Sequence, residues 1–173
     1  AAEAIDQGAL QAELQQAVDL VDRQMSTWQA DSDLMRLNAA PPGQWVELPE
    51  ELLWVLATAL QIGEQSGGAF DIGVGALVSA CGFGPQAAAE QLPPRPPRAR
   101  DALELDVPRR AARTHSRISL DLNGIAKGFA VDQLARCLRE HGVNNFLVGI
   151  DGEMRAAGHL SLIHISEPTR QEA

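Results

Sequence analysis

Asp121, Asn123 and Lys127 lie close together in a segment that also contains Gly124 and Gly128. The first amides of an α-helix have no partner inside the helix and carry partial positive charge, so a helix that begins here would attract an anion. Glycines allow a ligand to approach the backbone closely because they lack a Cβ atom. The segment therefore predicts an anion site, in which Lys127 either reaches a phosphate or points into solvent.

The residues before this site predict a strand and a turn that would position it. Residues 117–122 alternate apolar and polar side chains, as strands do. Asn123-Gly124 predicts a tight turn, and a helix is expected over 124–141. Asp121 is predicted to cap the loop after the strand, and Asp132 is predicted to lie on a solvated helix face. Residues 109–115 predict a neighbouring strand, and a strand pair is expected over 146–150 and 154–157.

The first half of the chain predicts two helices joined by irregular segments. Apolar residues at helical spacing predict a helix from Ala9 to about Trp28 and another from Pro49 to about Ser66. The connecting segments are expected to be a polar turn at 31–38, an extended piece at 45–48, an irregular glycine-rich segment at 69–85, a helical turn at 86–91 and a proline-rich connector at 93–98. Together the elements predict a single α+β domain of mixed helix and sheet layers.

Composition excludes several classes of partner. The chain has 173 residues, enough for one domain with a core, and a net charge of −9 argues against nucleic acid as a partner. No apolar run is long enough to span a bilayer, and no signal segment is expected at the first residues. Cys81 and Cys137 are interpreted as buried or half-buried thiols, and no zinc motif is present.

Several segments resemble one known family. Residues 120–132 resemble the glycine-rich core motif of the FAD:protein FMN transferases, the ApbE family. Further matches occur at residues 25–28, 32–38, 66–75, 82–85 and 149–155, and all the matches stand in the family's order along the chain. The similarity covers about Leu10 to Gly158 and implies an ApbE-like, T-fold-like α+β domain.

The resemblance implies a reaction. A threonine hydroxyl of an acceptor flavoprotein, such as a subunit of a membrane redox complex, would attack the FMN phosphorus of FAD and release AMP, with Mg²⁺ neutralising the phosphates. Two alternatives remain open: a non-catalytic FAD-binding protein, and an FAD pyrophosphatase in which water replaces the threonine. Family members are exported or membrane-anchored, so a periplasmic or anchored location is expected.

The resemblance also implies roles for particular residues. The backbone carbonyl of Ala126 is expected to bind Mg²⁺. Lys127 lies between two of the expected FAD contacts, Asn123 and Phe129, and is the candidate catalytic residue if it reaches a phosphate and does not point into solvent. The positions expected to contact FAD are Met25, Trp45, Ala69, Phe70, Asp71, Asn123 and Phe129. Met25 also fits the apolar stripe of its helix, so core packing is an alternative there.

The end of the chain is expected not to belong to this domain. Residues 160–170 look like a translated sequencing-library adaptor, so residues 159–173 are interpreted as an artefactual tail and residues 1–158 as the N-terminal portion of the domain. The family's remaining Mg²⁺ ligands, an Asp and a Thr, would follow that point. The chain by itself is therefore expected to be inactive, and it is expected to expose apolar surface.

Overall fold

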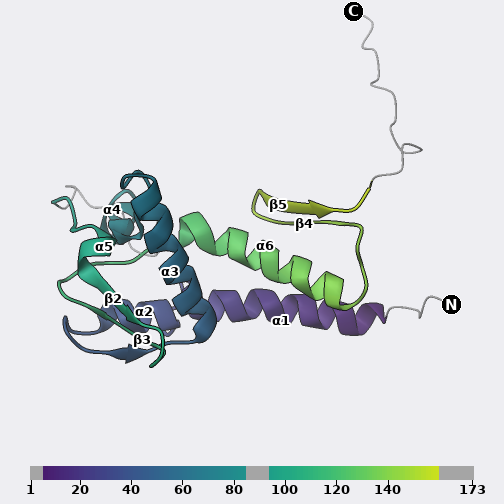
Figure 1. Ribbon diagram of the computed structural model, residues 1–173, viewed down its shortest axis with the longest axis horizontal. Coiled ribbons are helices and arrows are strands. Elements are labelled where there is room, and N and C mark those ends of the chain that lie inside the picture. Colours follow the sequence, from purple (N-terminus) through teal and green to yellow (C-terminus); the bar gives the residue numbers. More distant parts are fainter. Residues whose placement is uncertain (1–5, 85–93, 160–173) are drawn as a thin grey trace, which may run out of the picture.

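A computed structural model describes residues 6–84 and 94–159, and Figure 1 shows their arrangement. A lobe of short helices and strands lies at one end, and a pair of long helices with a β-hairpin extends from it. The elements in chain order are α1 (Gln7–Met25), α2 (Asp33–Ala39), β1 (Val46–Glu47), α3 (Glu50–Gln65), the 3₁₀-helix η1 (Ile72–Val74), α4 (Gly75–Ala80), α5 (Ala99–Ala102), β2 (Leu103–Asp106), β3 (Ala111–Thr114), α6 (Asn123–Glu140), β4 (Phe146–Ile150) and β5 (Glu153–Ala157).

The long helices α1 and α6 run side by side out of the lobe (Figure 1). The Asp6 carboxylate begins α1 by accepting hydrogen bonds from the amides of Gly8 and Ala9, at 2.9 and 3.2 Å. Val21 and Met25, near its end, are buried in the core. The helix ends at Met25, slightly before the predicted end at Trp28.

The helix α6 lies between α1 and the β4–β5 hairpin. It begins at Asn123, so the residues predicted to form an Asn123-Gly124 turn are instead the first two residues of the helix, and Asp121 accepts a hydrogen bond from the Asn123 amide at 2.8 Å. Asp121 thus has the predicted capping role. The hairpin closes through Asp151 and Gly152, whose φ angles of 50° and 104° suit a two-residue turn.

The three-stranded antiparallel sheet has the order β1-β3-β2. The strand predicted at 109–115 exists as β3, but residues 117–122 are not its partner and form no strand. Their backbone is bonded elsewhere: the Asn38 side chain pairs with both the amide and the carbonyl of Leu120, and the Asp121 amide donates to the Ile72 carbonyl. The partner strand β2 was not predicted, although Leu103 and Leu105 alternate with acidic residues.

Two further segments predicted as irregular are helical. Residues 31–38 contain α2, because the Ser32 hydroxyl accepts a hydrogen bond from the Met35 amide at 3.1 Å. Residues 69–85 contain η1 and α4, where Gly75 packs so closely that a Cβ would lie 2.6 Å from the Ser119 hydroxyl. Pro49 is the N-cap of α3, not its first residue. The helical turn predicted at 86–91 lies outside the described residues.

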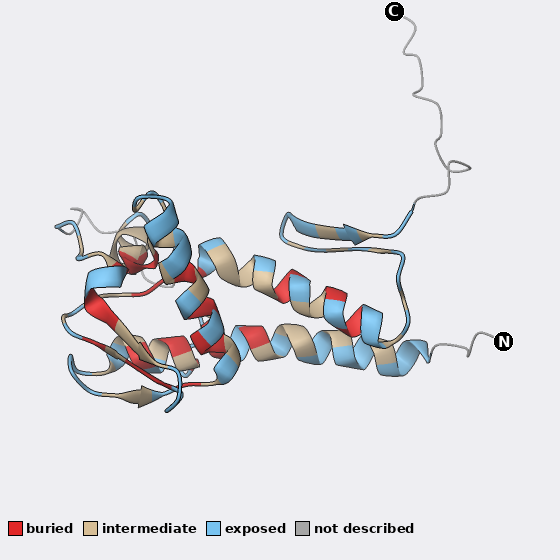
Figure 2. Ribbon diagram, in the orientation of Figure 1, coloured by how far each residue is buried: buried red, intermediate tan, exposed pale blue. Residues whose placement is uncertain are grey.

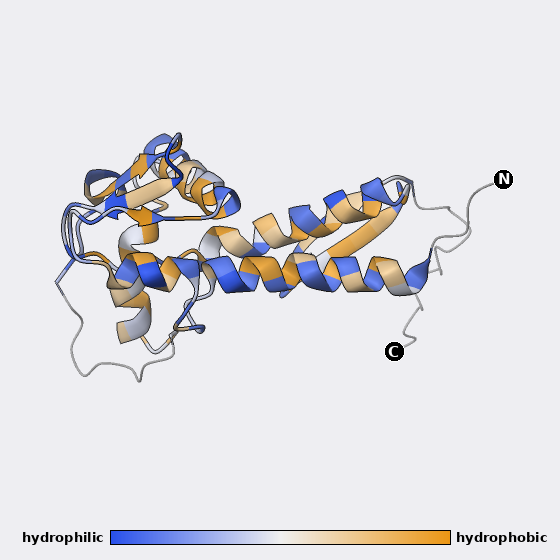
Figure 3. Ribbon diagram, turned by 90° about the horizontal axis from the view of Figure 1, so that it is seen from below, coloured by the Kyte–Doolittle hydropathy of each residue, from blue (hydrophilic) through white to orange (hydrophobic). Residues whose placement is uncertain are grey.

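The core lies inside the lobe and extends along the start of the helix pair (Figure 2). The long helix α3 contributes the largest share of fully buried side chains, and the segment before α6 adds two leucines. Apolar residues also line the hairpin, seen as an orange strand beside the helix pair in Figure 3. The buried centre consists of Leu34, Leu37, Leu52, Val55, Leu56, Ile72, Leu120 and Leu122.

Candidate functional site

A cavity of about 1000 Å³ lies where the lobe meets the helix pair. The end of α1, the loop before η1, the first turn of α6, the hairpin turn and the segment 95–98 all contribute to its walls. This volume is at the upper end of the range for pockets that bind small molecules. The predicted site residues that line it are Met25, Ala69, Phe70, Asp71, Asn123, Ala126 and Lys127.

Most of the amides at the start of α6 are already bonded within the protein. The Asn123 amide donates to Asp121, and the amides of Ile125 and Ala126 donate to the Leu122 carbonyl at 2.9 and 2.8 Å. These amides are therefore less available to an anion than the sequence predicts. Positive charge in the cavity comes instead from side chains.

Three cationic side chains line the cavity: Lys127, Arg95 and Arg98. The Lys127 ammonium lies 3.3 Å from the Asp151 carboxylate in the hairpin turn, so it bridges α6 and the hairpin. The Arg98 guanidinium packs against Gly68, where an added Cβ would lie only 2.8 Å from it. From the sequence, Arg95 and Arg98 were interpreted only as part of the proline-rich connector at 93–98.

Aromatic residues form the other notable part of the wall. Trp28 and Phe83 line the cavity and remain 65% and 74% exposed, and Phe70, which also lines it, packs against the core. Exposed aromatic rings in a cavity provide flat surfaces for stacking. Trp28 and Phe83 stand inside the segments that resemble the family, but they were not predicted as contacts.

Two of the acidic residues that line the cavity, Asp71 and Asp121, hold backbone amides. One carboxylate oxygen of Asp71 accepts hydrogen bonds from Gly73, at 2.8 Å, and from Ala99, at 3.0 Å. Asp121 is buried and receives both the amide and the side-chain nitrogen of Asn123. These hydrogen bonds shape the cavity wall.

The remaining predicted contacts lie elsewhere or have two roles. Met25 is 4% exposed and belongs both to the core and to the cavity wall. Trp45 does not line the cavity; the Arg113 guanidinium lies over its ring at 4.5 Å. Phe129 does not line it either, and its ring lies 5.6 Å from that of Trp54. The structure does not bring these two aromatics to the other predicted contacts.

The described residues offer Mg²⁺ an incomplete set of ligands. The half-buried Ala126 lines the cavity, and a carbonyl oxygen is a suitable hard ligand. The nearby carboxylates of Asp71, Asp121 and Asp151 already bind amides or Lys127. Within residues 6–84 and 94–159, no group of three metal-ligating side chains surrounds this point. The described residues alone therefore do not complete a magnesium site in this cavity.

Comparison with known proteins gives the same family throughout the chain. The ApbE family model matches residues 1–173. The FAD:protein FMN transferase of Klebsiella pneumoniae is 32% identical in an alignment that covers 95% of this chain and 51% of that protein. The enzyme of the same name from Haemophilus influenzae is 34% identical, over 80% of this chain and 43% of that protein.

Solved structures agree with the sequence matches. The flavin transferase ApbE from Vibrio cholerae superposes with a TM-score of 0.81 at 30% identity, over 88% of this chain and 52% of that one. The predicted α+β fold is confirmed by this match. The chain spans about half the length of the curated relatives it matches. These comparisons show that the chain belongs to the ApbE family.

Proposed function

We propose that the protein transfers FMN from FAD to a threonine hydroxyl of an acceptor flavoprotein, and that the cavity at the start of α6 holds the FAD. The observation that carries the proposal is a cavity whose walls combine exposed aromatic rings, cationic side chains and several aspartates, and which is built largely from segments that resemble the family's motifs. Its relatives are named FAD:protein FMN transferases. FAD is the substrate in this proposal, and AMP is the leaving group.

The cavity walls suit the two chemical parts of FAD. Its flat ring systems match the exposed faces of Trp28 and Phe83, where stacking gains dispersion energy. Its diphosphate matches the positive charge of Arg98 and Lys127. Lys127 would exchange or share its contact with Asp151 when it meets a phosphate.

The transfer step makes one bond and breaks another. The threonine oxygen bonds to the FMN phosphorus, the phosphorus–oxygen bond to the AMP phosphate breaks, and the hydroxyl proton is released to solvent. Lys127 would stabilise charge that grows on the phosphate oxygens. We include Mg²⁺ in the proposal: bound Mg²⁺ supplies charge neutralisation, with Ala126 as one ligand and further ligands from outside the described residues.

The location follows the family resemblance. We propose that the acceptor is an exported or membrane-bound flavoprotein and that the enzyme works on the same side of the membrane. None of the helices in the described part of the chain combines the length and apolar character needed to cross a bilayer.

The decisive assay uses a chimera that joins residues 1–158 to the corresponding second half of the Vibrio cholerae flavin transferase. It is incubated with FAD, Mg²⁺ and a peptide carrying an acceptor threonine. We expect FMN attached to the peptide by mass spectrometry, one AMP per attachment, and loss of both with EDTA. The 173-residue chain alone is the second arm, in which we expect no transfer.

The product pattern separates the proposal from its alternatives. AMP released without labelled peptide would indicate an FAD pyrophosphatase, in which water attacks instead of threonine. FAD bound without AMP release would indicate a non-catalytic binding protein. Either result in a folded chimera would contradict the transferase proposal.

A further inference from the structure

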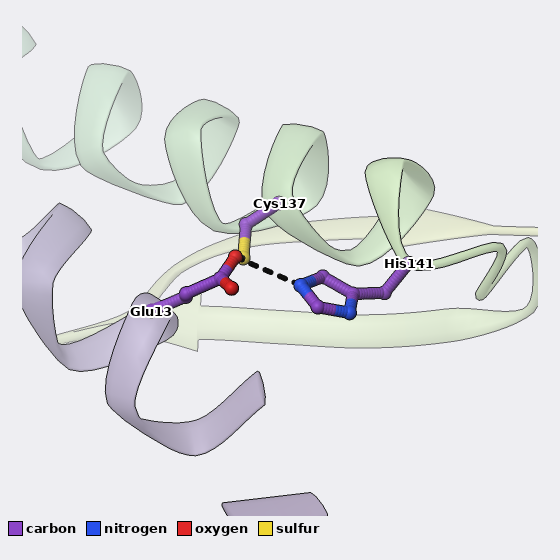
Figure 4. Close-up of side chains that lie close together, drawn as sticks. All are labelled: Glu13, Cys137 and His141. Carbon is purple, nitrogen blue, oxygen red and sulfur yellow. Dashed lines mark hydrogen bonds and ion pairs between the residues drawn. The ribbon is translucent and has the colours of Figure 1, made fainter. Parts of the chain in front are cut away.

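A second cluster of reactive side chains lies at the far end of the helix pair, away from the cavity. Glu13 comes from α1, Cys137 from the last turns of α6, and His141 directly follows α6 (Figure 4). Figure 4 shows the three side chains pointing toward one another across the gap between the two helices. In the described part of the chain, no other group of three or more potential metal-ligating side chains converges in this way.

The distances suit a single metal ion. One Glu13 carboxylate oxygen lies 2.8 Å from Nε2 of His141 and 3.9 Å from Sγ of Cys137, and the ligand atoms all lie within 4.8 Å of one another. A tetrahedral Zn²⁺ ion with bonds of about 2.0–2.3 Å separates its ligand atoms by roughly 3.3–3.8 Å. Small side-chain rotations would therefore fit the ion between them.

The backbone already fixes two of the three ligands. Cys137 and His141 are four residues apart, so they project from the same side of the last helical turn. Glu13 meets them from a separate helix that packs along α6. The sequence alone predicts no zinc motif, because the third ligand lies more than a hundred residues away and only the packing of α1 on α6 brings it in.

The thiol is protonated in the metal-free site. Burial, followed by the nearby carboxylates of Glu13 and Glu140, raises the pKa of the Cys137 thiol, and Arg136 opposes them. A metal ion must therefore displace the thiol proton when it binds. The support for a metal site is the convergence of the three side chains, whose ligand atoms lie within 4.8 Å of one another.

We propose that Glu13, Cys137 and His141 bind Zn²⁺, with a water molecule as the fourth ligand. The sulfur–zinc bond forms as the thiol releases its proton to solvent, and neutral His141 donates the Nε2 lone pair. The mixed sulfur, nitrogen and oxygen ligand set is one that zinc accepts. The ion would link α1 to α6 at the end of the pair that is farthest from the core.

The alternative is a simple Glu13–His141 ion pair beside a buried thiol. That arrangement needs no metal and gives no sulfur-dependent spectrum. The two explanations therefore predict different optical results. Neither explanation depends on FAD, so the test of this site is independent of the test of the proposed transferase function.

The test is a titration of the reduced 173-residue chain with Co²⁺, which replaces Zn²⁺ and reports its ligands optically. We expect a thiolate-to-cobalt charge-transfer band and intense visible d–d bands, saturating at one Co²⁺ per chain. Added Zn²⁺ should remove both, because zinc binds such sites more tightly than cobalt. Zn²⁺ should also raise the melting temperature, since an ion that binds only the folded chain stabilises it.

Matched variants assign the ligands. The sequence has two cysteines, so Cys137→Ser should abolish the charge-transfer band and Cys81→Ser should keep it. Glu13→Gln and His141→Gln should each weaken Co²⁺ binding at least about tenfold, since even the loss of a residue that only hydrogen-bonds to a metal ligand commonly weakens binding by that factor. Glu140→Gln, a carboxylate on the same helix, should leave binding within about threefold. Circular dichroism checks that each variant keeps its helices.

Three results would overturn the proposal. The first is the absence of a thiolate band in the wild-type chain at saturating Co²⁺. The second is a band that Cys81→Ser removes and Cys137→Ser keeps. The third is an affinity within twofold of wild type for Glu13→Gln or for His141→Gln.

Discussion

Single carboxylates shape the candidate cavity by holding backbone amides. Asp71 is the clearest case, because one of its oxygens joins η1 to the start of α5 through Gly73 and Ala99. The sequence identifies Asp71 as a site residue, but its partner Ala99 lies 28 residues away and could not be found from local pattern. Asp121 differs, because its partner Asn123 is two residues away, and its capping role was predictable.

Asp71→Ala is expected to destabilise the fold by roughly 1–2 kcal/mol, because it leaves two amides without their acceptor. Asp71→Asn keeps an acceptor oxygen and should lose less than half as much. Urea unfolding of both variants measures the difference. Equal losses would show that the negative charge, and not the pair of hydrogen bonds, is what matters at this position.

Cys137 makes stability depend on alkaline pH in the metal-free chain. Its pKa is raised above the ordinary value of 9.0, so the folded chain keeps the thiol proton where the unfolded chain loses it. The contribution of Cys137 is therefore fully present below pH 9 and is lost as pH rises through the raised pKa. We expect EDTA-treated wild type to lose stability above pH 9 more steeply than Cys137→Ser.

Thermal melts between pH 7 and pH 10 check this expectation, with Cys81→Ser as the control. That variant changes an exposed cysteine and should retain the wild-type pH dependence. Identical slopes for wild type and Cys137→Ser would contradict the inferred pKa shift.

At the scale of elements, the sequence predicts the long helices and the hairpin well and the short elements poorly. The helices α1, α3 and α6 carry long apolar stripes, and the β4–β5 pair flanks a clear turn at Asp151-Gly152. The segment 117–122 has the alternation of a strand, but the Asn38 side chain and backbone groups of η1 and α4 satisfy its backbone. Tertiary contacts determine whether a segment with this alternation forms a strand, and the periodicity of the sequence does not reveal those contacts.

Asn38 is the side chain that replaces a strand neighbour for this segment. It donates to the Leu120 carbonyl at 2.9 Å and accepts from the Leu120 amide at 2.8 Å. Asn38→Ala leaves both groups of a fully buried residue unpaired, so we expect a loss of about 1–3 kcal/mol in the free energy of unfolding.

The exposed Asn144 provides the control, because its side chain makes only a local contact with the Gly142 carbonyl. Asn144→Ala should change the free energy of unfolding by less than about 0.5 kcal/mol. If the two alanine variants were equally stable in denaturant titrations, Asn38 would not be the group that holds this segment.

At the scale of the whole molecule, the outer face of the hairpin is unusually apolar. Leu147 and Met154 are each 65% exposed, on strands whose other side packs against α6. Exposed apolar side chains promote association in water. We expect the 173-residue chain to self-associate, and Leu147→Lys with Met154→Lys to reduce that association.

Light scattering across a concentration series measures this effect. The matched control is Val148→Lys, because Val148 is a half-buried neighbour on the same strand. It should lower the melting temperature without reducing association. If the variant with both Leu147→Lys and Met154→Lys scatters as strongly as wild type, the outer face of the hairpin is not the surface through which the chain associates.

The family of the protein was more accessible from sequence than the geometry of its candidate site. Motifs in order indicate the family, and the comparisons show it. Trp28, Phe83 and Arg98 were not predicted as cavity residues, since they come from three separate segments that only the fold brings together. Trp45 and Phe129 remain predicted FAD contacts that lie outside the cavity.

A flavin-fluorescence titration of the chimera measures whether the cavity at the start of α6 binds FAD, as we propose. Asn123 lines the cavity, whereas Asp132 is exposed on α6 and pairs with Arg155 of the hairpin. Asn123→Ala should raise the Kd for FAD about two- to tenfold, as expected for one lost polar contact. Asp132→Ala should leave it within twofold. An equal loss of affinity in both variants would contradict the assignment of the FAD site to this cavity.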